Sequence, residues 1–260
     1  MDSIEQIKAE SRVKKKIYAV DLFCGAGGLT HGLERAGIDV RLGVDIDPAC
    51  EHPYSANNAA KFLLMPIEDL KAKDIKKSFP KKGIRLLAGC APCQTFSTYC
   101  QKATPDDKRW WLLLHFARLV EVISPELVTM ENVSRLKDQD VFKEFIGTLR
   151  DAEYHIDNEI VNCEDYGIPQ HRQRLVLLAS KLGPVHLLSS SQFGAKRTTV
   201  RESIADLPPL QAGEVDRSDP LHQASALSEL NRKRLEASKP GGTWRDWQMT
   251  LVADCHKKKT

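Results

Sequence analysis

The chain of 260 residues has no apolar run approaching the roughly 18 residues that span a bilayer. Residues 1–16 form a polar, basic tail without the apolar core of a signal peptide. No internal repeat is visible, and the length allows one substantial core, or one domain and part of another. With 42% hydrophobic and 28% charged residues, the sequence predicts a globular protein of the cytoplasm with no membrane partner.

A strong charge of one sign is also absent, because the formal net charge is only +3. So small an excess does not establish a nucleic-acid partner. Short basic clusters suit contacts with phosphates, although lysines on a solvated surface produce the same pattern. These clusters lie at residues 14–16, 76–77, 81–82, 232–234 and 257–259.

The seven cysteines are an odd number and show no disulfide framework. Cys90 and Cys93 have the Cys-x-x-Cys spacing of some zinc and redox sites. A structural zinc ion takes about four ligands, and no second pair of this kind or matching histidine pair is present. A redox pair usually begins a helix, whereas a polar stretch follows Cys93. We therefore expect free thiols and no metal. The remaining cysteines are expected to be small packing residues: Cys24, Cys50, Cys100, Cys163 and Cys255.

Apolar strands alternate with helices of amphipathic spacing through most of the chain, which predicts an α/β fold with a doubly wound, mostly parallel sheet. Ligands of such sheets bind at the carboxyl ends of the strands, and each polar block described below is expected at such an end or just beyond it. The composition shifts near residues 185–200, where we place a boundary. Strands are predicted at 17–23, 40–44, 84–88, 126–130 and 174–179. A turn at 25–28 leads into a helix that continues to about residue 36, and further helices are predicted at 110–123, 141–149 and 224–237.

A glycine-rich turn follows the first predicted strand. Its glycines, at positions 25, 27, 28 and 32, do not have the G-x-G-x-x-G spacing of dinucleotide sites, although a dehydrogenase remains an alternative. Asp45 ends the second predicted strand, 20 residues beyond Gly25, where a carboxylate typically binds ribose hydroxyls. This pattern indicates a nucleotide-like ligand.

Three further blocks carry reactive groups. Residues 89–97 place the thiol of Cys93 directly after Pro92, and residues 130–133 place Glu131 at the end of an apolar strand. Residues 170–174, at the start of a further apolar strand, carry Arg172 and Arg174. In order and spacing, these blocks and the glycine turn resemble the DNA (cytosine-5)-methyltransferase family, closely over residues 17–180. The resemblance implies a Rossmann-like class I fold, with a catalytic domain at 17–190, and S-adenosylmethionine as cofactor.

The resemblance also implies the cofactor contacts, with the turn around the amino-acid part and Asp45 on the ribose. In the family, an acid usually contacts the adenine amino group. Pro66 occupies the matching position here, so Glu68 or Asp69 would have to make this contact. Trp110 and Trp111 stand where smaller residues are more common. The expected cofactor residues are Phe23, Cys24, Gly25, Ala26, Gly27, Gly28, Asp45, Ile46, Ile67, Pro92 and Leu112.

By the same resemblance, Cys93 adds to carbon-6 of a cytosine flipped out of the duplex, which activates carbon-5. Glu131 is the partner of ring nitrogen-3, and Asn132 supports the loop and the target amino group. Arg174 suits the cytosine oxygen, and Arg172 lowers the pKa of the thiol or holds Glu131 in place. The expected substrate and DNA contacts are Gln94, Ser97 and Gln170.

Residues 191–260 are interpreted as a linker and the beginning of a target-recognition region of bacterial type. The blocks that usually close the family's chains are not visible, so an expressed fragment, a truncated gene product and one subunit of a split enzyme all remain open. The predicted function is methylation of carbon-5 of cytosine in double-stranded DNA of a bacterial modification system. Alternatives are methylation of transfer RNA, and an inactive subunit that binds DNA or a partner polypeptide.

Overall fold

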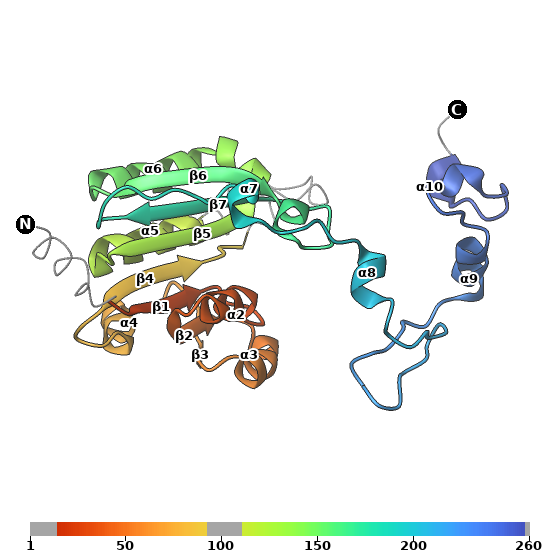
Figure 1. Ribbon diagram of the computed structural model, residues 1–260, viewed down its shortest axis with the longest axis horizontal. Helices are drawn as coiled ribbons and strands as arrows, with labels where there is room; N and C mark the ends of the chain where they lie inside the picture. Colours follow the sequence, from red (N-terminus) through yellow and green to blue (C-terminus); the bar gives the residue numbers. More distant parts are fainter. Residues whose placement is uncertain (1–14, 93–110, 258–260) are drawn as a thin grey trace, which may run out of the picture. The chain divides into compact units, whose positions relative to one another are not determined.

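The computed structural model describes residues 15–92 and 111–257. Contacts between residues divide the chain into two units, with the division after Thr199 (Figure 1). The first unit contains the sheet and the predicted site. The second unit is described separately below.

The first unit is built on a seven-stranded sheet of order β3-β2-β1-β4-β5-β7-β6. The pairs among β3, β2, β1, β4 and β5 are parallel, whereas β7 runs antiparallel to both β5 and β6. The predicted, mostly parallel sheet is confirmed. Its strands are β1 (Ile17–Leu22), β2 (Asp39–Asp45), β3 (Lys61–Leu64), β4 (Ile84–Gly89), β5 (Leu127–Val133), β6 (His155–Asn162) and β7 (Gln173–Ser180).

The two faces of the sheet are packed differently. One face is covered by α4, α5 and α6 through a continuous core that includes Leu87, Phe116, Met130 and Phe145. The opposite face is packed by α2 and α3 through a smaller cluster around Tyr54. The helices of this unit are α2 (Gly28–Arg35), α3 (Glu51–Asn57), α4 (Ala72–Ser78), α5 (Trp111–Ile123), α6 (Asp140–Asp151) and α7 (Ser190–Phe193).

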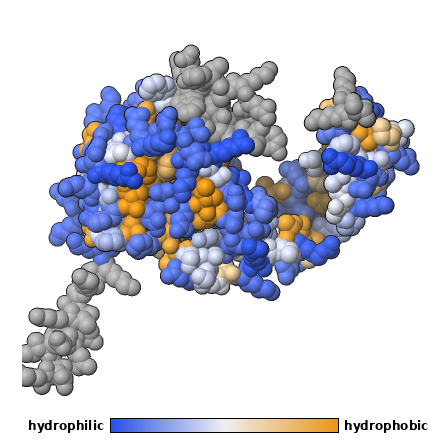
Figure 2. Space-filling model, turned by 90° about the horizontal axis from the view of Figure 1, so that it is seen from above, coloured by the Kyte–Doolittle hydropathy of each residue, from blue (hydrophilic) through white to orange (hydrophobic). Residues whose placement is uncertain are grey.

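On the face that carries α2 and α3, the side chains of β5 and β7 are half-buried, whereas their alternate residues are buried against α5 and α6. The exposed apolar residues Ile168 and Phe193 line a cavity together with Val176 and Leu178 of β7. Figure 2 shows separate hydrophobic patches between hydrophilic residues on the visible face of the first unit. Polar residues on β5 and β7 can therefore reach a ligand on this face.

The second unit contains short helices joined by turns. Ser228 caps α9 by accepting a hydrogen bond from the backbone N–H of Asn231 at 3.3 Å. The indole ring of Trp244 stacks on His256 with 4.4 Å between ring centroids. Arg234 donates from Nε to the carbonyl of Leu251 at 2.7 Å, which joins α9 to the last segment. The helical elements are α8 (Val200–Ile204), α9 (Glu229–Glu236), η6 (Trp244–Asp246) and α10 (Asp254–Lys257).

Candidate active site

The turn after β1 is shaped by residues with positive φ angles, at Phe23 (58°), Gly25 (53°) and Gly27 (96°). A Cβ atom on Gly27 would lie 2.2 Å from Nδ2 of Asn58, so a side chain is excluded there for steric as well as conformational reasons. A Cβ on Gly25 would meet nothing within 4 Å. The backbone at Gly25 is therefore open to a ligand.

Asp45, the last residue of β2, is connected to this turn. Its Oδ2 accepts a hydrogen bond from the backbone N–H of Gly25 at 2.8 Å, and its Oδ1 accepts one from Asp47 at 3.0 Å. Two residues that are 20 positions apart in the sequence thus meet at one edge of the sheet. The remaining lone pairs of the carboxylate can accept hydrogen bonds from ligand hydroxyls.

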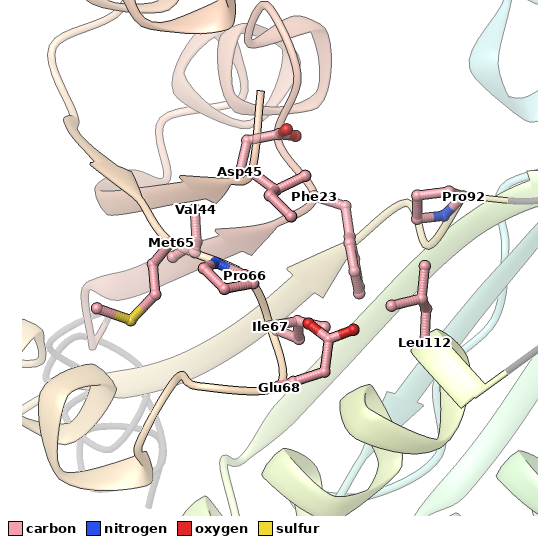
Figure 3. Close-up of a pocket in the computed structure, with 10 residues that line it drawn as sticks. Phe23, Val44, Asp45, Met65, Pro66, Ile67, Glu68, Pro92 and Leu112 are labelled. Atoms are coloured by element: carbon pink, nitrogen blue, oxygen red, sulfur yellow. The ribbon is translucent and has the colours of Figure 1, made fainter. Parts of the chain in front are cut away.

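A cavity of about 190 Å³ lies beside the turn. Figure 3 shows the Phe23 ring between the Pro66–Ile67 segment on one side and Pro92 and Leu112 on the other, with Asp45 at the end away from Glu68. The lining is mainly apolar, and the volume is below the range of about 300–1,000 Å³ for pockets that hold drug-sized ligands. This cavity suits one part of a ligand, such as a flat base beside a ribose held by Asp45.

Six of the predicted cofactor residues line this cavity: Phe23, Asp45, Ile46, Ile67, Pro92 and Leu112. The other five, Cys24 to Gly28, form the adjoining turn. Val44 and Met65 also line the cavity. Neither was predicted to contact the cofactor, although each directly precedes a residue considered for cofactor binding, Asp45 and Pro66. Of the two acids expected to substitute at Pro66, Glu68 is part of the lining and Asp69 is not.

A buried carboxyl group lies at the base of the turn. Asp21 is fully buried on β1, its Oδ2 accepts a hydrogen bond from the hydroxyl of Thr30 at 2.7 Å, and Thr30 is 3.0 Å from the hydroxyl of Tyr54. Oδ1 of Asp21 has no hydrogen-bond partner among the described residues. Burial raises the pKa of Asp21 to about 7, although the hydrogen bonds of Thr30 act in the opposite direction.

The second part of the site lies where β4 and β5 end and β7 begins. Oε1 of Glu131 on β5 lies 2.7 Å from Nε of Arg174 on β7. In the antiparallel register Val133 pairs with Arg174 and Glu131 with Val176, so Glu131 and Arg174 are diagonal neighbours on one face. Residues 170–174, predicted at the start of a strand, lie at the amino end of β7. This end reaches the edge formed by the carboxyl ends of β4 and β5 because β7 is antiparallel to β5.

Asn132 connects β5 to the segment that leads to Cys93. Its side chain is buried, donates from Nδ2 to the carbonyl of Ala91 at 3.0 Å, and accepts at Oδ1 from the N–H of Val133 at 2.9 Å. Both polar groups of this side chain bind backbone. The arrangement holds Ala91 two residues before Cys93, which corresponds to the loop-supporting role expected for Asn132.

The surroundings of Glu131 affect its protonation. Burial raises the pKa of Glu131, whereas a hydrogen bond from the thiol of Cys90 and the positive charge of Arg172 act in the opposite direction. Arg172 is exposed, as is Gln170, whose backbone N–H donates to the carbonyl of Ile168 at 2.7 Å. Cys90 was not predicted to contact the acid. Cys93, Gln94 and Ser97 lie outside the described residues.

Two further findings concern the described residues alone. No group of three or more histidine, cysteine, aspartate or glutamate side chains there could hold a metal ion. No helix in residues 15–92 and 111–257 is long and apolar enough to cross a membrane.

The fold and the arrangement of the site define a class I S-adenosylmethionine-dependent methyltransferase with a Rossmann-like sheet. A solved structure of a prophage-encoded candidate DNA modification methyltransferase from E. coli is similar, with a TM-score of 0.64 and 27% identity over 77% of this chain and 57% of its own. The family model described as C-5 cytosine-specific DNA methylase matches residues 17–259, and the chain belongs to that family.

Type II enzymes are among its relatives. M.HgiDII, a Type II methylase from Herpetosiphon aurantiacus, is 41% identical over 244 residues, which are 93% of this chain and 69% of the relative. M.XorII, a Type II methyltransferase from Xanthomonas oryzae pv. oryzae, is 34% identical over 202 residues, which are 74% of this chain and 47% of the relative. The chain therefore spans between about half and about two thirds of the length of these relatives. Membership of the family implies S-adenosylmethionine as methyl donor and DNA as substrate.

Proposed function

We propose that this chain transfers a methyl group from S-adenosylmethionine to carbon-5 of cytosine in double-stranded DNA, through a covalent bond between Cys93 and carbon-6. The observation that carries the proposal is the Glu131–Arg174 pair, 2.7 Å apart. It lies at the sheet edge where Asn132 holds the segment before Cys93. An acid, a cation and a thiol are the groups that this reaction needs.

The residues of the turn and the cavity fit the cofactor. The open backbone at Gly25 suits the amino-acid part, Asp45 suits the ribose hydroxyls, and the apolar lining suits a flat base. When bound, S-adenosylmethionine supplies an electrophilic methyl group on a sulfonium centre. Glu68 is the acid available near the base, because Pro66 has no side-chain acceptor.

Residues of this chain direct the proton transfers and the movements of electron pairs in the reaction. The Cys93 thiolate forms a bond to carbon-6, and the ring electrons move toward carbon-5 while Glu131 provides a proton or hydrogen bond at nitrogen-3. Arg174 neutralises charge beside the ring oxygen, and Arg172 adds positive charge near Glu131. After methylation, a water molecule from solvent takes the carbon-5 proton, and the electrons of that bond re-form the carbon-5–carbon-6 double bond. The sulfur–carbon bond breaks with its electrons on Cys93, which leaves as thiolate, and a proton given to nitrogen-3 returns to Glu131.

We extend the proposal to the conditions in which the chain works. It acts on DNA in the bacterial cytoplasm, at the nucleoid, and needs no metal ion.

The test is transfer of radiolabelled methyl groups to duplex DNA and, separately, to transfer RNA, with Cys93→Ala as control. Label in DNA that the variant abolishes would support the proposal, and label in RNA would overturn the substrate. No label in either would overturn activity of the chain alone. DNA that contains 5-fluorocytosine adds a direct readout of the covalent step, since fluorine at carbon-5 cannot leave as a proton does and the protein–DNA bond persists.

A further inference from the structure

The backbone around Cys90 is fixed from two sides. The N–H of Cys90 donates to the carbonyl of Leu22 at the end of β1, at 3.2 Å. The next carbonyl, that of Ala91, accepts the hydrogen bond from Asn132 at 3.0 Å. Cys90 thus has a defined position just beyond β4.

The register of the sheet places this position beside Glu131. Strands β4 and β5 are parallel, with Ala88 opposite Thr129 and Gly89 opposite Met130. Continued by one residue, this register puts Cys90 opposite Glu131, on the same face as Ala88 and Thr129. At this position the thiol of Cys90 can donate a hydrogen bond to the Glu131 carboxylate, an interaction that acts to lower the pKa of Glu131.

Glu131 therefore has a partner on each neighbouring strand. Arg174 on β7 contacts Oε1 at 2.7 Å, and the register puts the thiol of Cys90, beyond β4, beside the carboxylate on the other side. A glutamate side chain has three rotatable bonds, and contacts from two sides restrict them. A carboxyl group that must meet one ring nitrogen benefits from such restriction.

We propose that Cys90 is a positioning residue, which together with Arg174 orients the Glu131 carboxyl group toward ring nitrogen-3 of the target cytosine. The inference rests on the function proposed for Glu131 above. It assigns to the first cysteine of the Cys-x-x-Cys pair a role distinct from zinc binding, redox chemistry and nucleophilic attack.

The environment keeps Cys90 in the thiol form that can donate a hydrogen bond. Burial raises the pKa of Cys90, and the charges of Glu131 and Asp21 raise it further. Cys90 thus remains protonated at neutral pH and does not compete with Cys93 as a nucleophile. Among the described residues other than Cys90, the ionisable groups that act on Glu131 or on its partners are Asp21 on β1, Cys163 in η5 (Cys163–Tyr166), and Arg172 and Arg174 at β7.

The contact is tested independently of activity by a double-mutant cycle for stability. Urea unfolding is measured for the full chain, Cys90→Ala, Glu131→Gln and the double variant. Contacting residues are expected to couple, so the combined effect on the unfolding equilibrium constant should differ from the product of the single effects by about 3- to 10-fold. If the effects of the two single substitutions on the unfolding equilibrium constant simply multiplied, the inferred contact between Cys90 and Glu131 would be wrong. Cys90→Ser, which keeps a donor, provides a second variant if Cys90→Ala does not fold.

The role is tested by single-turnover methyl transfer as a function of pH. Cys90→Ala is expected to lower the rate constant about 10-fold with unchanged affinity for DNA, because only the orientation of Glu131 changes. The thiol hydrogen bond favours the charged carboxylate, so its loss raises the pKa of Glu131 and moves the basic limb of the profile to higher pH. Cys90→Ser should restore most of the rate, and Cys255→Ala, an exposed cysteine of the second unit, should change neither quantity.

The outcomes separate this inference from the proposed function. A wild-type chain that transfers no methyl group would overturn the proposed function. Transfer by the wild-type chain that Cys90→Ala leaves unchanged in rate and pH profile would overturn only the role of Cys90.

Discussion

Glu131 and Arg174 form an ion pair of 2.7 Å although they lie on different strands and 43 positions apart in the sequence. The pair joins the end of β5 to the beginning of β7, at the edge of the sheet where Asn132 also holds the segment before Cys93.

Replacement of Arg174 by alanine is expected to lower the single-turnover rate of methyl transfer by about 10²- to 10³-fold, the usual effect of removing one donor that stabilises developing charge. Arg41→Ala is the matched control, because Arg41 pairs with Asp39 at 3.3 Å near the opposite end of the sheet. A rate for Arg174→Ala equal to that of the control would show that the pair has no part in the reaction.

Replacement of Asp45 by asparagine is expected to weaken binding of S-adenosylmethionine by about 10- to 100-fold, because hydrogen bonds to a charged acceptor are lost. Isothermal titration calorimetry measures the change. Asp39→Asn, at the other end of β2, removes the same charge from the same strand and should leave the affinity unchanged. Equal affinities for the two variants would contradict the assignment of the cofactor site.

Asp21 is expected to make stability depend on pH. Its pKa is raised from 3.8 to about 7 in the folded protein, so between these values the folded state binds more protons than the unfolded state. The stabilisation is complete below about pH 4 and is lost as the pH rises through about 7. The pKa difference limits the contribution of Asp21 to the free energy of unfolding to at most about 4 kcal/mol.

The check is urea unfolding of the wild-type chain and Asp21→Asn at about pH 5 and pH 8. Asparagine does not titrate and retains an oxygen that can accept the hydrogen bond from Thr30. The free energy of unfolding of the variant should therefore no longer show this part of the pH dependence. Compared with the wild-type chain, the variant should be relatively more stable at pH 8 than at pH 5. An unchanged slope in the variant would mean that another group is responsible.

Gly27→Ala is expected to destabilise the fold by about 1–3 kcal/mol, since alanine is strained at a φ of 96° and its Cβ would collide with Asn58. Gly32→Ala is the contrasting variant. A Cβ at Gly32, within α2, would meet nothing within 4 Å, so alanine there should be neutral or stabilising by about 0.5–1 kcal/mol. Thermal unfolding of the two variants gives the comparison, and equal melting temperatures would refute the steric argument.

The sequence predicted most of the parallel half of the fold because its strands are continuous apolar runs that end at glycine or acidic residues. The strands β1, β2, β4, β5 and β7 and the helices α2, α5 and α6 all overlap their predicted ranges within a few residues. The strands β3 and β6 were not predicted. The first has only four residues, and the second is an edge strand on which polar residues such as Asp157 and Glu159 interrupt the apolar pattern.

Contacts between distant segments were harder to predict than the elements themselves. The direction of β7 is not encoded in its own apolar run, since a strand buried on one side looks the same in either orientation. The contact between Cys90 and Glu131 depends on the register of two strands and has no local signal. The hydrogen bond between Gly25 and Asp45 was not predicted either, although the sequence placed both residues at the ends of two strands that follow each other along the chain.

The register of the antiparallel pairing between β5 and β7 affects both the catalytic site and the stability of the fold. A slip of one residue in this pairing would turn Arg174 toward the helices and bring Leu175 beside Glu131. Such a chain would bury a cation and lose its acid partner in the same event. A misregistered molecule would thus be unstable and inactive together, which leaves no long-lived species that modifies DNA with an incomplete site.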